Sequence, residues 1–435
     1  MPCSRLWLRW RPALCLAAAV AALAAAPASA DAAERPPQLD ADAWVLVDAS
    51  DGDRLAARSA SSRRAIASAT KLMTAYVALR ELPLGRRVKA PDYQPSSPLE
   101  SLAGLQAGER LSVRDLLYAL LLESANDAAV TLADAVSGSV PKFVREMNRT
   151  AAALGLVHTS YENPIGLDAS ANYSSASDLA ELTLRLRREG IFRRLVDTPE
   201  VVLRTGSRTR EIDNRNLLVS RVPWVNGVKT GHTQQAGYVL VGSGTRKGTT
   251  LVSVVLGAPS EAARDEETLR LLDYGFSLYR TETVAGADEE VASPELRYQD
   301  TTLPLVAERR LRVSKRRGEE LDTQIVAPDE VEGPIDRGEE LGELVATIDG
   351  RDAGSVALMA GRAADEATFL ERARSAISAP VAVLAIVGVV ILIAVGVARR
   401  RSNRKRRTPE ERMRSDEERT RRRETEMTTE QGDRG

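Results

Sequence analysis

The sequence predicts a fold of the α/β class, of the α+β type, followed by a small β-rich domain and one transmembrane helix. Within the first 280 residues, helical patterns occur at 72–79, 111–123 and 128–136, and β-branched strand patterns follow at 238–242 and 249–256. From about Glu282 the chain contains short β-prone runs between glycine, proline and acidic turns. Residues 379–398 then form an uncharged apolar stretch of about 20 residues, long enough to cross a bilayer.

Length and composition exclude several classes of function. The 435 residues suffice for two or three domains, and the net charge is −1. His158 and His232 are the chain's two histidines, and Cys3 and Cys15 its two cysteines. A Cys/His metal site is therefore not expected, and neither is a cofactor, because no glycine-rich phosphate loop follows a predicted strand. No compact basic and aromatic surface occurs before the C-terminal tail, so nucleic acid binding is not expected either.

Residues 1–30 have the order of a signal peptide. Three arginines precede the apolar run 13–26, and Ala28-Ser29-Ala30 provides a small-residue cleavage site. The alternative is a retained N-terminal anchor, but 14 apolar residues are short for a span. After cleavage the chain contains no cysteine, so its stability must come from burial rather than disulfides. Residues 31–40, with Pro36-Pro37, form a predicted linker.

The next segment, 41–280, is predicted to be the main domain. Residues 43–48 alternate into a turn at 49–52, which indicates a first hairpin. The run 72–79 is a predicted buried helix, and 111–123 a second helix with Ser112 as its N-terminal cap. The polar tripeptide Ser124-Ala125-Asn126 separates that helix from the next, at 128–136. Side chains at such an interruption are well placed to enter a cleft.

The later part of this domain is predicted to contain a loop, two helices and two strands. Residues 158–178 are loop-like, and 179–186 are helical. The strands 238–242 and 249–256 are joined by a turn at 246–248. An amphipathic helix is predicted over 266–279, with one side formed by Leu269, Leu272, Phe276 and Tyr279.

The C-terminal third is predicted to be a β domain and a membrane anchor. Residues 281–362 form the β domain, from the runs 311–313, 323–326, 344–348 and 355–359. A juxtamembrane segment (363–378), a transmembrane helix (379–398) and a basic tail (399–435) follow. Because positive residues stay on the cytoplasmic side, the bulk of the chain is expected outside the cell membrane and the tail inside. A buried soluble helix is the alternative reading of 379–398.

Ser68 and Lys71 form the first candidate catalytic pair. Ser68 lies at or just before the first turn of the helix 72–79, where free N–H groups and the helix dipole favour a developing anion. Lys71 follows at i+3 on the same face, so its amine can reach the serine hydroxyl. By composition such a pair is expected about twice in this chain, and Ser139…Lys142 and Ser402…Lys405 are the other two. The alternative is a helix cap beside a solvated lysine.

Two further motifs distinguish Ser68 from these other pairs. They are Ser124-Ala125-Asn126 between two helices and Lys229-Thr230-Gly231 just before the predicted strand 238–242. The tripeptide also recurs at 170–172, but there it lies in a loop without flanking helices. Each motif is weak alone, whereas their order, spacing and local context together predict a serine/lysine acyl-transfer enzyme.

On these motifs the sequence resembles the low-molecular-weight penicillin-binding proteins, the serine D-alanyl-D-alanine carboxypeptidases. The resemblance covers about 41–280, including 66–74, 124–128, 214–216 and 229–233, and a fainter likeness to the family's second domain covers 332–360. It implies an antiparallel sheet flanked by helices, as in β-lactamases and transpeptidases. It also implies that Ser124 lies on a helical subdomain and that Lys229 faces Ser68 from a strand.

The resemblance implies a role for each motif residue. Neutral Lys71 takes the Ser68 proton, which requires its pKa to fall by roughly 3 units, or about 4–5 kcal/mol; burial and the Lys229 ammonium both act in that direction. Ser68 attacks the penultimate D-alanine of a peptidoglycan stem peptide, and Ser124 passes the proton to the leaving group. The remaining expectations concern substrate binding, by Asn126, Lys229, Thr230, Gly231 and the N–H of His232, with Arg215 and Arg264 as carboxylate ligands or surface ion pairs. Penicillins are expected to acylate Ser68 as inhibitors.

The sequence also departs from the family pattern, and three alternative functions remain. Ile165 stands where a polar residue is common, which leaves the deacylating loop undefined. A class A β-lactamase shares the three motifs, but the region around Glu162 lacks its Glu-x-x-Leu-Asn pattern. A peptidoglycan DD-endopeptidase would use identical chemistry. A non-catalytic penicillin-binding receptor is the alternative of another class.

Overall fold

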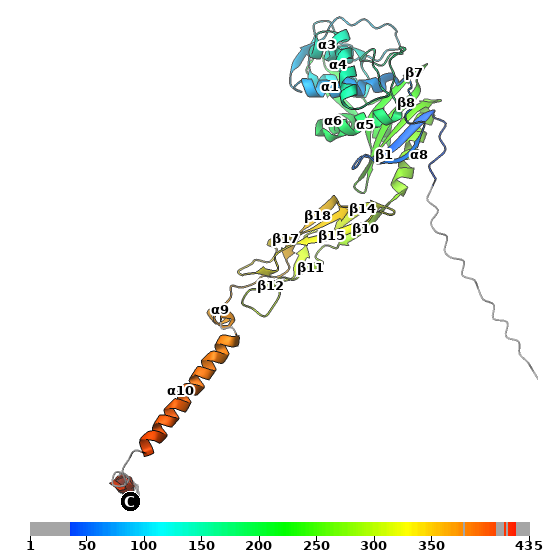
Figure 1. Cartoon of the computed structure of the whole chain (residues 1–435). Coiled ribbons are helices and arrows are strands. Elements are labelled where there is room, and N and C mark those ends of the chain that lie inside the picture. The colour runs from blue at the N-terminus through cyan, green and yellow to red at the C-terminus, as the bar shows by residue number, and fades with distance from the viewer. Residues whose placement is uncertain (1–34, 377–378, 406–412, 415, 423–435) are drawn as a thin grey trace, which may run out of the picture. The chain divides into compact units, whose positions relative to one another are not determined.

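The computed structural model describes residues 35–376, 379–405, 413–414 and 416–422 (Figure 1). The predicted signal peptide at 1–30 and both cysteines lie outside the described residues. The chain divides into two compact units, one ending at Arg280 and the other beginning at Thr281. The elements of the first unit are β1 (Ala43–Asp48), β2 (Arg54–Arg58), the 3-10 helix η1 (Ala67–Thr70), α1 (Lys71–Glu81), β3 (Arg87–Lys89), β4 (Arg110–Ser112), α2 (Val113–Tyr118), the π-helix η2 (Ala119–Glu123), α3 (Asn126–Ser137), α4 (Val140–Ala153), α5 (Ala176–Arg188), α6 (Gly190–Val196), β5 (Glu200–Leu203), β6 (Arg210–Asp213), α7 (Leu218–Arg221), β7 (Val225–Thr233), β8 (Gly237–Arg246), β9 (Thr249–Ala258) and α8 (Glu261–Ser277).

An antiparallel sheet of order β2-β1-β9-β8-β7 forms the centre of the first unit. The predicted turn at 246–248 joins β8 to β9, with φ of 49° at Lys247 and 88° at Gly248, the backbone of a tight hairpin turn. Alternate residues of β1 face opposite sides, because side chains in a strand alternate. Val45 packs in the core that includes α5, whereas Leu46 packs with Leu272 of α8. The predicted antiparallel sheet between helices is confirmed.

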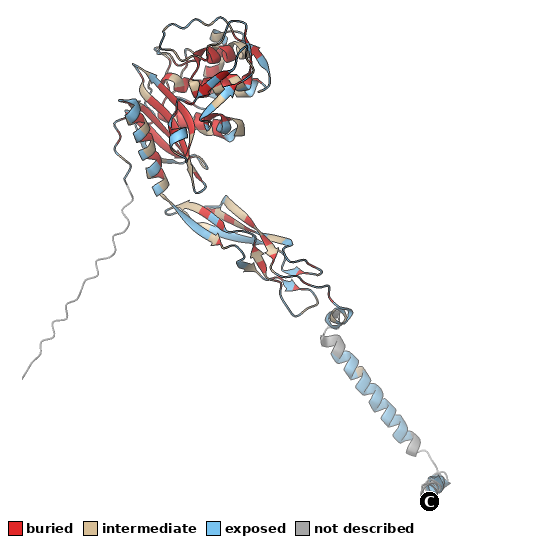
Figure 2. Cartoon of the chain, turned by 180° about the vertical axis from the view of Figure 1, so that it is seen from behind, coloured by how far each residue is buried: buried red, intermediate tan, exposed pale blue. Residues whose placement is uncertain are grey.

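The helical subdomain contains α1, η2, α3 and α4, whose apolar side chains share the core of the α5 side. Figure 2 shows in red the buried stretches of the helices and of the central sheet. Ser112 caps α2 as predicted, since its Oγ accepts the N–H of Asp115 at 3.1 Å. Leu111, however, lies in β4 rather than in the helix, because Val88 of β3 pairs with it. The helical path from 113 then changes to a π-helical turn at 119–123, which ends at Ser124.

Helix α8 begins and ends earlier than the pattern predicts. Ser260 caps it, with Oγ accepting the N–H of Ala263 at 3.1 Å. Tyr279 was expected on its apolar side, and this is wrong: the helix ends at Ser277, and Tyr279 begins β10. Its hydroxyl donates to the Asp48 carboxylate, a partner distant in sequence that no helical period reveals.

The second unit is mostly β structure, as predicted. Its elements are β10 (Tyr279–Ala285), which starts at the unit boundary, β11 (Glu290–Ala292), β12 (Glu295–Leu296), β13 (Leu305–Ala307), β14 (Leu311–Arg316), β15 (Leu321–Val326), β16 (Glu330–Val331), β17 (Glu340–Ile348), β18 (Arg351–Ala360), α9 (Phe369–Ala376) and α10 (Ala379–Lys405). The larger sheet has the order β11-β13-β18-β17-β15. Leu305, Leu344 and Leu358 belong to its core.

Helix α10 covers the segment predicted to span the membrane (379–398) and continues to Lys405. It starts at Ala379, and its segment Val383–Ser402 is long and apolar enough to cross a membrane. Leu384 and Leu392 are about 70% exposed, at 69% and 72%, so the soluble alternative of a buried core helix is not supported.

Candidate active site

Ser68 and Lys71 lie one turn apart at the junction of η1 and α1. Ser68 is half-buried in the 3-10 turn, and Lys71 is the first residue of α1 and fully buried. The Lys71 amine, Nζ, lies 3.0 Å from Ser68 Oγ. The helical spacing read from the sequence therefore places amine and hydroxyl in hydrogen-bond contact.

The surroundings of Lys71 favour its neutral form. Burial and the Lys229 ammonium hold the pKa of Lys71 well below its usual range. Its amine also donates to the carbonyl oxygen of Ile165. The group of Ile165 that bonds to the lysine is thus its backbone carbonyl, which any residue at this position carries.

Lys229 reaches the site from β7, an edge strand of the central sheet. Gly231, two residues further on, lies against η1, and a Cβ placed on it would meet the Ser68 nitrogen at 3.0 Å. A glycine there lets the strand approach the serine backbone. Lys229 is 1% exposed, and burial together with Arg215 and Arg264 lowers its pKa to about 7. Its Nζ donates to the carbonyl of Thr230 at 2.9 Å.

Ser124 and Asn126 flank the start of α3. Ser124 adopts a left-handed conformation with φ of 64°, the point where the π-helical turn ends and the chain changes direction. Both residues are buried, at 5% exposure each. The Asn126 amide donates from Nδ2 to Glu100 Oε2 at 2.7 Å. The sequence predicted that side chains between the two helices would point inward. In the structure Ser124 and Asn126 are buried at the point where the π-helical turn ends and α3 begins.

The two candidate arginines are both ion-paired. Arg215 pairs with Glu123 at 2.6 Å, next to Ser124, and its side chain is half exposed. Arg264 of α8 is buried and pairs with Asp265 at 2.7 Å and Glu261 at 3.0 Å. Because both lower the pKa of Lys229, their guanidinium groups add positive charge at the place where a carboxylate is expected.

Thr230 and His232 differ in exposure. Thr230 is buried, whereas the His232 side chain is exposed and stacks on Tyr238, with ring centroids 4.1 Å apart. The imidazole is thus held on the strand surface by a neighbouring ring. The role expected for His232 concerns its backbone N–H and not the imidazole.

The loop at 163–168 contains Ile165, and the sequence left the part of this loop in deacylation undefined. Asn163 Oδ1 accepts the N–H groups of Ile165, Gly166 and Leu167, at 3.2, 2.6 and 3.2 Å. Asp168 then accepts from Thr233 Oγ1 at 2.7 Å, which ties the loop to the end of β7. The Asn-Pro-x-Gly pattern indicates a turn, but its contact with Ser68 depends on the tertiary fold.

Glu100 was missed by sequence reasoning. It lies in the segment 91–109 between β3 and β4, hereafter the covering segment, and its carboxylate contacts Asn126 and Tyr93. Burial opposes its ionisation, yet hydrogen bonds from Tyr93, Asn126 and Ser96 lower the pKa of Glu100 to about 2. No motif marks this residue in the sequence.

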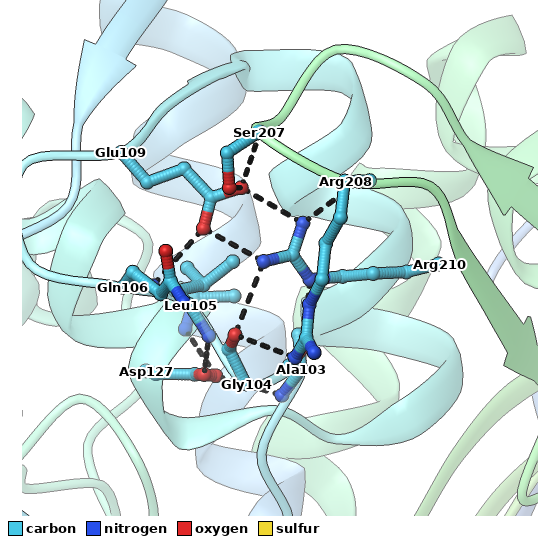
Figure 3. Close-up of polar contacts among 10 residues, drawn as sticks. Ala103, Gly104, Leu105, Gln106, Glu109, Asp127, Ser207, Arg208 and Arg210 are labelled. Atoms are coloured by element: carbon cyan, nitrogen blue, oxygen red, sulfur yellow. Dashed lines mark hydrogen bonds and ion pairs between the residues drawn. The ribbon is translucent and has the colours of Figure 1, made fainter.

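A buried ion pair anchors the covering segment (Figure 3). Arg210 of β6 and Glu109 pair at 2.7 Å, and their side chains are 5% and 1% exposed. The guanidinium also donates to the carbonyl oxygens of Ala103 and Gly104, at 2.9 and 3.1 Å. Asp127 of α3 accepts the N–H of Ala103 at 3.0 Å, so the segment is held to the helix that begins at Asn126.

Within the described part of the chain, no group of three or more His, Cys, Asp or Glu side chains is placed to hold a metal ion. Glu162 Oε2 accepts the N–H of Ala171 at 3.1 Å, within its own loop. Glu162 therefore stabilises the conformation of its own loop.

Comparison with known sequences gives two family matches. The sequence profile of the D-alanyl-D-alanine carboxypeptidase family matches residues 30–260, and that of the C-terminal domain of penicillin-binding protein 5 matches residues 279–366. The chain is 31% identical over 320 residues to D-alanyl-D-alanine carboxypeptidase DacF of Bacillus subtilis, covering 72% of this chain and 82% of that protein. It is 31% identical over 339 residues to DacA of Escherichia coli K12, covering 72% and 81%.

Solved structures of penicillin-binding proteins and a DD-transpeptidase also match the chain. Penicillin-binding protein 5 from Haemophilus influenzae matches with a TM-score of 0.55 and 31% identity, covering 77% of this chain and 100% of that one. A single-residue mutant of Streptomyces K15 DD-transpeptidase matches with a TM-score of 0.53 and 32% identity, covering 56% of this chain and 100% of that one. Both units of the chain thus have relatives with a solved structure.

Proposed function

The chain belongs to the D-alanyl-D-alanine carboxypeptidase family of serine peptidases, and from this premise we propose that Ser68, Lys71 and Ser124 carry out its catalysis. The observation that carries the proposal is the 3.0 Å contact between Lys71 Nζ and Ser68 Oγ in a site with a second buried lysine. A buried amine with a lowered pKa can accept a proton at neutral pH, which a solvated lysine cannot.

The acylation step follows from these groups. Neutral Lys71 takes the proton from Ser68 Oγ, which attacks the carbonyl carbon of the penultimate D-alanine. The N–H groups of Ser68 and His232 receive the developing oxyanion, because Gly231 allows the two backbone segments to meet. Ser124 passes a proton to the leaving D-alanine nitrogen, and an acyl-enzyme on Ser68 remains.

The cationic end of the site recognises the substrate's terminal carboxylate. Lys229 is buried with a pKa of about 7, so a carboxylate placed beside it restores the ammonium form. Thr230 adds a hydroxyl donor, and the buried Arg264 adds positive charge from α8. The positive charge of this end suits a substrate with a free carboxylate next to the scissile bond, as a peptide ending in D-alanine has.

The substrate and the cellular setting complete the proposal. The peptide is a peptidoglycan stem pentapeptide ending in D-Ala-D-Ala, and β-lactam antibiotics acylate Ser68 and inhibit the enzyme. Residues 1–30 direct export, α10 anchors the chain in the cell membrane, and the basic residues after it stay in the cytoplasm. The peptidase unit then faces the cell wall.

Hydrolysis is one of two fates of the acyl-enzyme. One structural relative is named a DD-transpeptidase, and this chain covers that whole structure at 32% identity. An amine that enters in place of water would give transpeptidation through the same Ser68 intermediate. The second candidate function is therefore transfer of the acyl group to an amino acceptor.

The test uses the full chain in detergent with a pentapeptide ending in D-Ala-D-Ala. Release of D-alanine is expected for wild type and loss of release for Ser68→Ala and Lys71→Ala. An added amino-acid acceptor distinguishes the fates, since a new peptide product means transfer. Fluorescent penicillin should label wild type and not Ser68→Ala. An inert wild-type protein, or labelling that survives Ser68→Ala, contradicts the proposal, and rapid penicillin turnover would instead indicate a β-lactamase.

A further inference from the structure

We propose that Glu100 is a positioning residue for the reaction, which fixes the direction in which the Asn126 amide faces the substrate. This inference rests on the proposed function, because it assigns Asn126 to substrate binding. The observation behind it is the contact from Asn126 Nδ2 to Glu100 Oε2 at 2.7 Å.

The amide of an asparagine presents different chemistry on its two sides. Its nitrogen donates and its oxygen accepts, so a rotation by 180° exchanges the two at almost the same shape. An ionised carboxylate only accepts, and a carboxylate beside the amide therefore selects the orientation with the nitrogen towards it. Glu100 is such a group, and Asn126 Oδ1 is accordingly directed away from that carboxylate.

Glu100 is itself held in one place. Its Oε1 accepts the N–H and the hydroxyl of Ser96, both at 2.7 Å, and the N–H of Ser97 at 3.3 Å. Oε2 accepts from Tyr93 as well as from Asn126. Both carboxylate oxygens of Glu100 thus accept hydrogen bonds. A glutamine amide could not replace them, because it has one oxygen that accepts and a nitrogen that donates.

The covering segment around Glu100 is rigidly attached to α3. Asn126 donates its backbone N–H to the carbonyl of Ser101 at 2.8 Å. Asp127 accepts the N–H groups of Ala103 and Leu105, at 3.0 and 2.9 Å, beside the Arg210–Glu109 pair (Figure 3). The carboxylate and the amide that it orients are therefore parts of one connected group, and their separation is set by the backbone.

Glu100 also belongs to the charges that act on Lys71. The charged groups around this lysine come from four elements, namely Lys229 of β7, Arg215 after β6, Asp127 of α3 and Glu100 of the covering segment. The two cations lower the pKa of Lys71, whereas the two carboxylates raise it. Removal of the Glu100 charge should therefore leave the lysine neutral at a lower pH. This shift reports the loss of the Glu100 charge near Lys71, and a substitution that disturbed only packing would leave the acid limb where it is.

The test is Glu100→Gln in the full chain, measured by kcat/KM for D-alanine release from the pentapeptide between pH 4 and 9. The expected result is a loss on the order of 10-fold at the pH optimum, as for removal of other groups that orient a functional side chain. The acid limb is expected to move to lower pH. Asp92→Asn is the matched control, because it removes the same charge from an exposed side chain of the same segment, whose carboxylate accepts from Gln94.

A double-mutant cycle tests the route through Asn126. If Glu100 acts by orienting the amide, Glu100→Gln should cost less than about twofold at the pH optimum once Asn126→Ala has removed that amide. Equal losses in the two backgrounds overturn the proposal. So does a Glu100→Gln enzyme with wild-type kcat/KM and an unmoved acid limb.

Tyr93→Phe keeps the proposal testable if Glu100→Gln does not fold, which circular dichroism would reveal. This variant removes one donor to Glu100 and keeps its charge. The expected result is a smaller loss of kcat/KM with no movement of the acid limb, and a wild-type rate would count against the proposal. A wild-type chain that neither releases D-alanine nor binds penicillin would instead refute the proposed function, which is a distinguishable failure.

Discussion

Gly166 packs directly against Ala67, the residue before the candidate nucleophile. A Cβ atom placed on Gly166 would lie 2.0 Å from the Ala67 carbonyl oxygen and 2.9 Å from the Ser68 nitrogen. Gly166 also has φ of +89°, and Ala67 has φ of 45°. The loop 163–168 and the turn that carries Ser68 are thus in backbone contact, which requires a residue without a side chain at this point.

We expect Gly166→Ala to reduce acylation of Ser68 on the order of 100-fold, because a displacement of about 1 Å at the nucleophile has an effect of that size. The added methyl group meets backbone atoms, which cannot rotate away. The measurement is the rate of labelling by fluorescent penicillin. Gly155→Ala is the control, since Gly155 also has a positive φ, of +74°, and a Cβ added to it would meet nothing within 4 Å. Similar rates for the two variants would contradict the prediction.

The pH dependence of kcat/KM should have an alkaline limb near pH 7. Substrate binding needs the Lys229 ammonium, and its pKa is lowered to about 7 by burial, Arg215 and Arg264. As the pH rises through this value the free enzyme loses the charge that binds the carboxylate, and kcat/KM falls. The acid limb belongs to Lys71, which must be neutral and whose pKa lies well below its usual range.

Lys229→Arg identifies the group behind that alkaline limb. A guanidinium stays charged throughout this range, so the variant should lose the decline near pH 7 even if its maximal rate is lower. Rates of D-alanine release at subsaturating peptide give the profile directly. A decline that persists unchanged in Lys229→Arg would assign it to another group.

The Arg210–Glu109 pair should contribute strongly to stability. Arg210→Leu leaves a buried carboxylate without its cation, which costs about 3–5 kcal/mol. Thermal unfolding followed by tryptophan fluorescence measures the loss. The matched control is Arg185→Leu, which removes a half-exposed partner of Glu181 on the surface of α5 and should cost less than about 1 kcal/mol. Equal losses for the two variants would contradict the burial argument.

This contribution should disappear in acid. Hydrogen bonds from Arg210, Gln106 and Ser207 outweigh the effect of burial and lower the pKa of Glu109 from 4.5 to about 2 in the folded chain. A lowered folded-state pKa stabilises the fold above the unfolded value, and this stabilisation is lost as the pH falls through the folded value. The difference in stability between wild type and Arg210→Leu is therefore expected to shrink between about pH 4.5 and pH 2.

The membrane topology can be tested with single cysteines. Thr368→Cys and Arg419→Cys are placed at exposed positions before and after α10, in a chain whose Cys3 and Cys15 are replaced by serine. A maleimide that cannot cross membranes should label residue 368 in intact cells and residue 419 only after lysis. Deletion of 379–405 should release the protein from membranes. Labelling of residue 419 in intact cells would reverse the proposed orientation.

The local elements of this protein could be predicted from its sequence because they depend on neighbours in the chain. The Ser112 cap, the hairpin turn at 246–248 and the apolar helix from Ala379 each follow from a short pattern and appear in the structure. The i+3 spacing of Ser68 and Lys71 is of the same kind, since one helical turn brings the two side chains together. The errors at Leu111 and Tyr279 lie at element ends, where partners distant in sequence determine the structure.

Tertiary structure alone decided which groups surround these side chains. Burial of Lys229 beside Arg215 and Arg264 brings together residues of β7, the segment after β6, and α8, and no local pattern encodes their common environment. The contacts of Gly166 with Ala67 and of Glu100 with Asn126 likewise join segments far apart in the chain. The sequence determined the reactive groups and the local turns that present them. The fold determined their pKa values and orientations, because electrostatics and packing depend on distance in space.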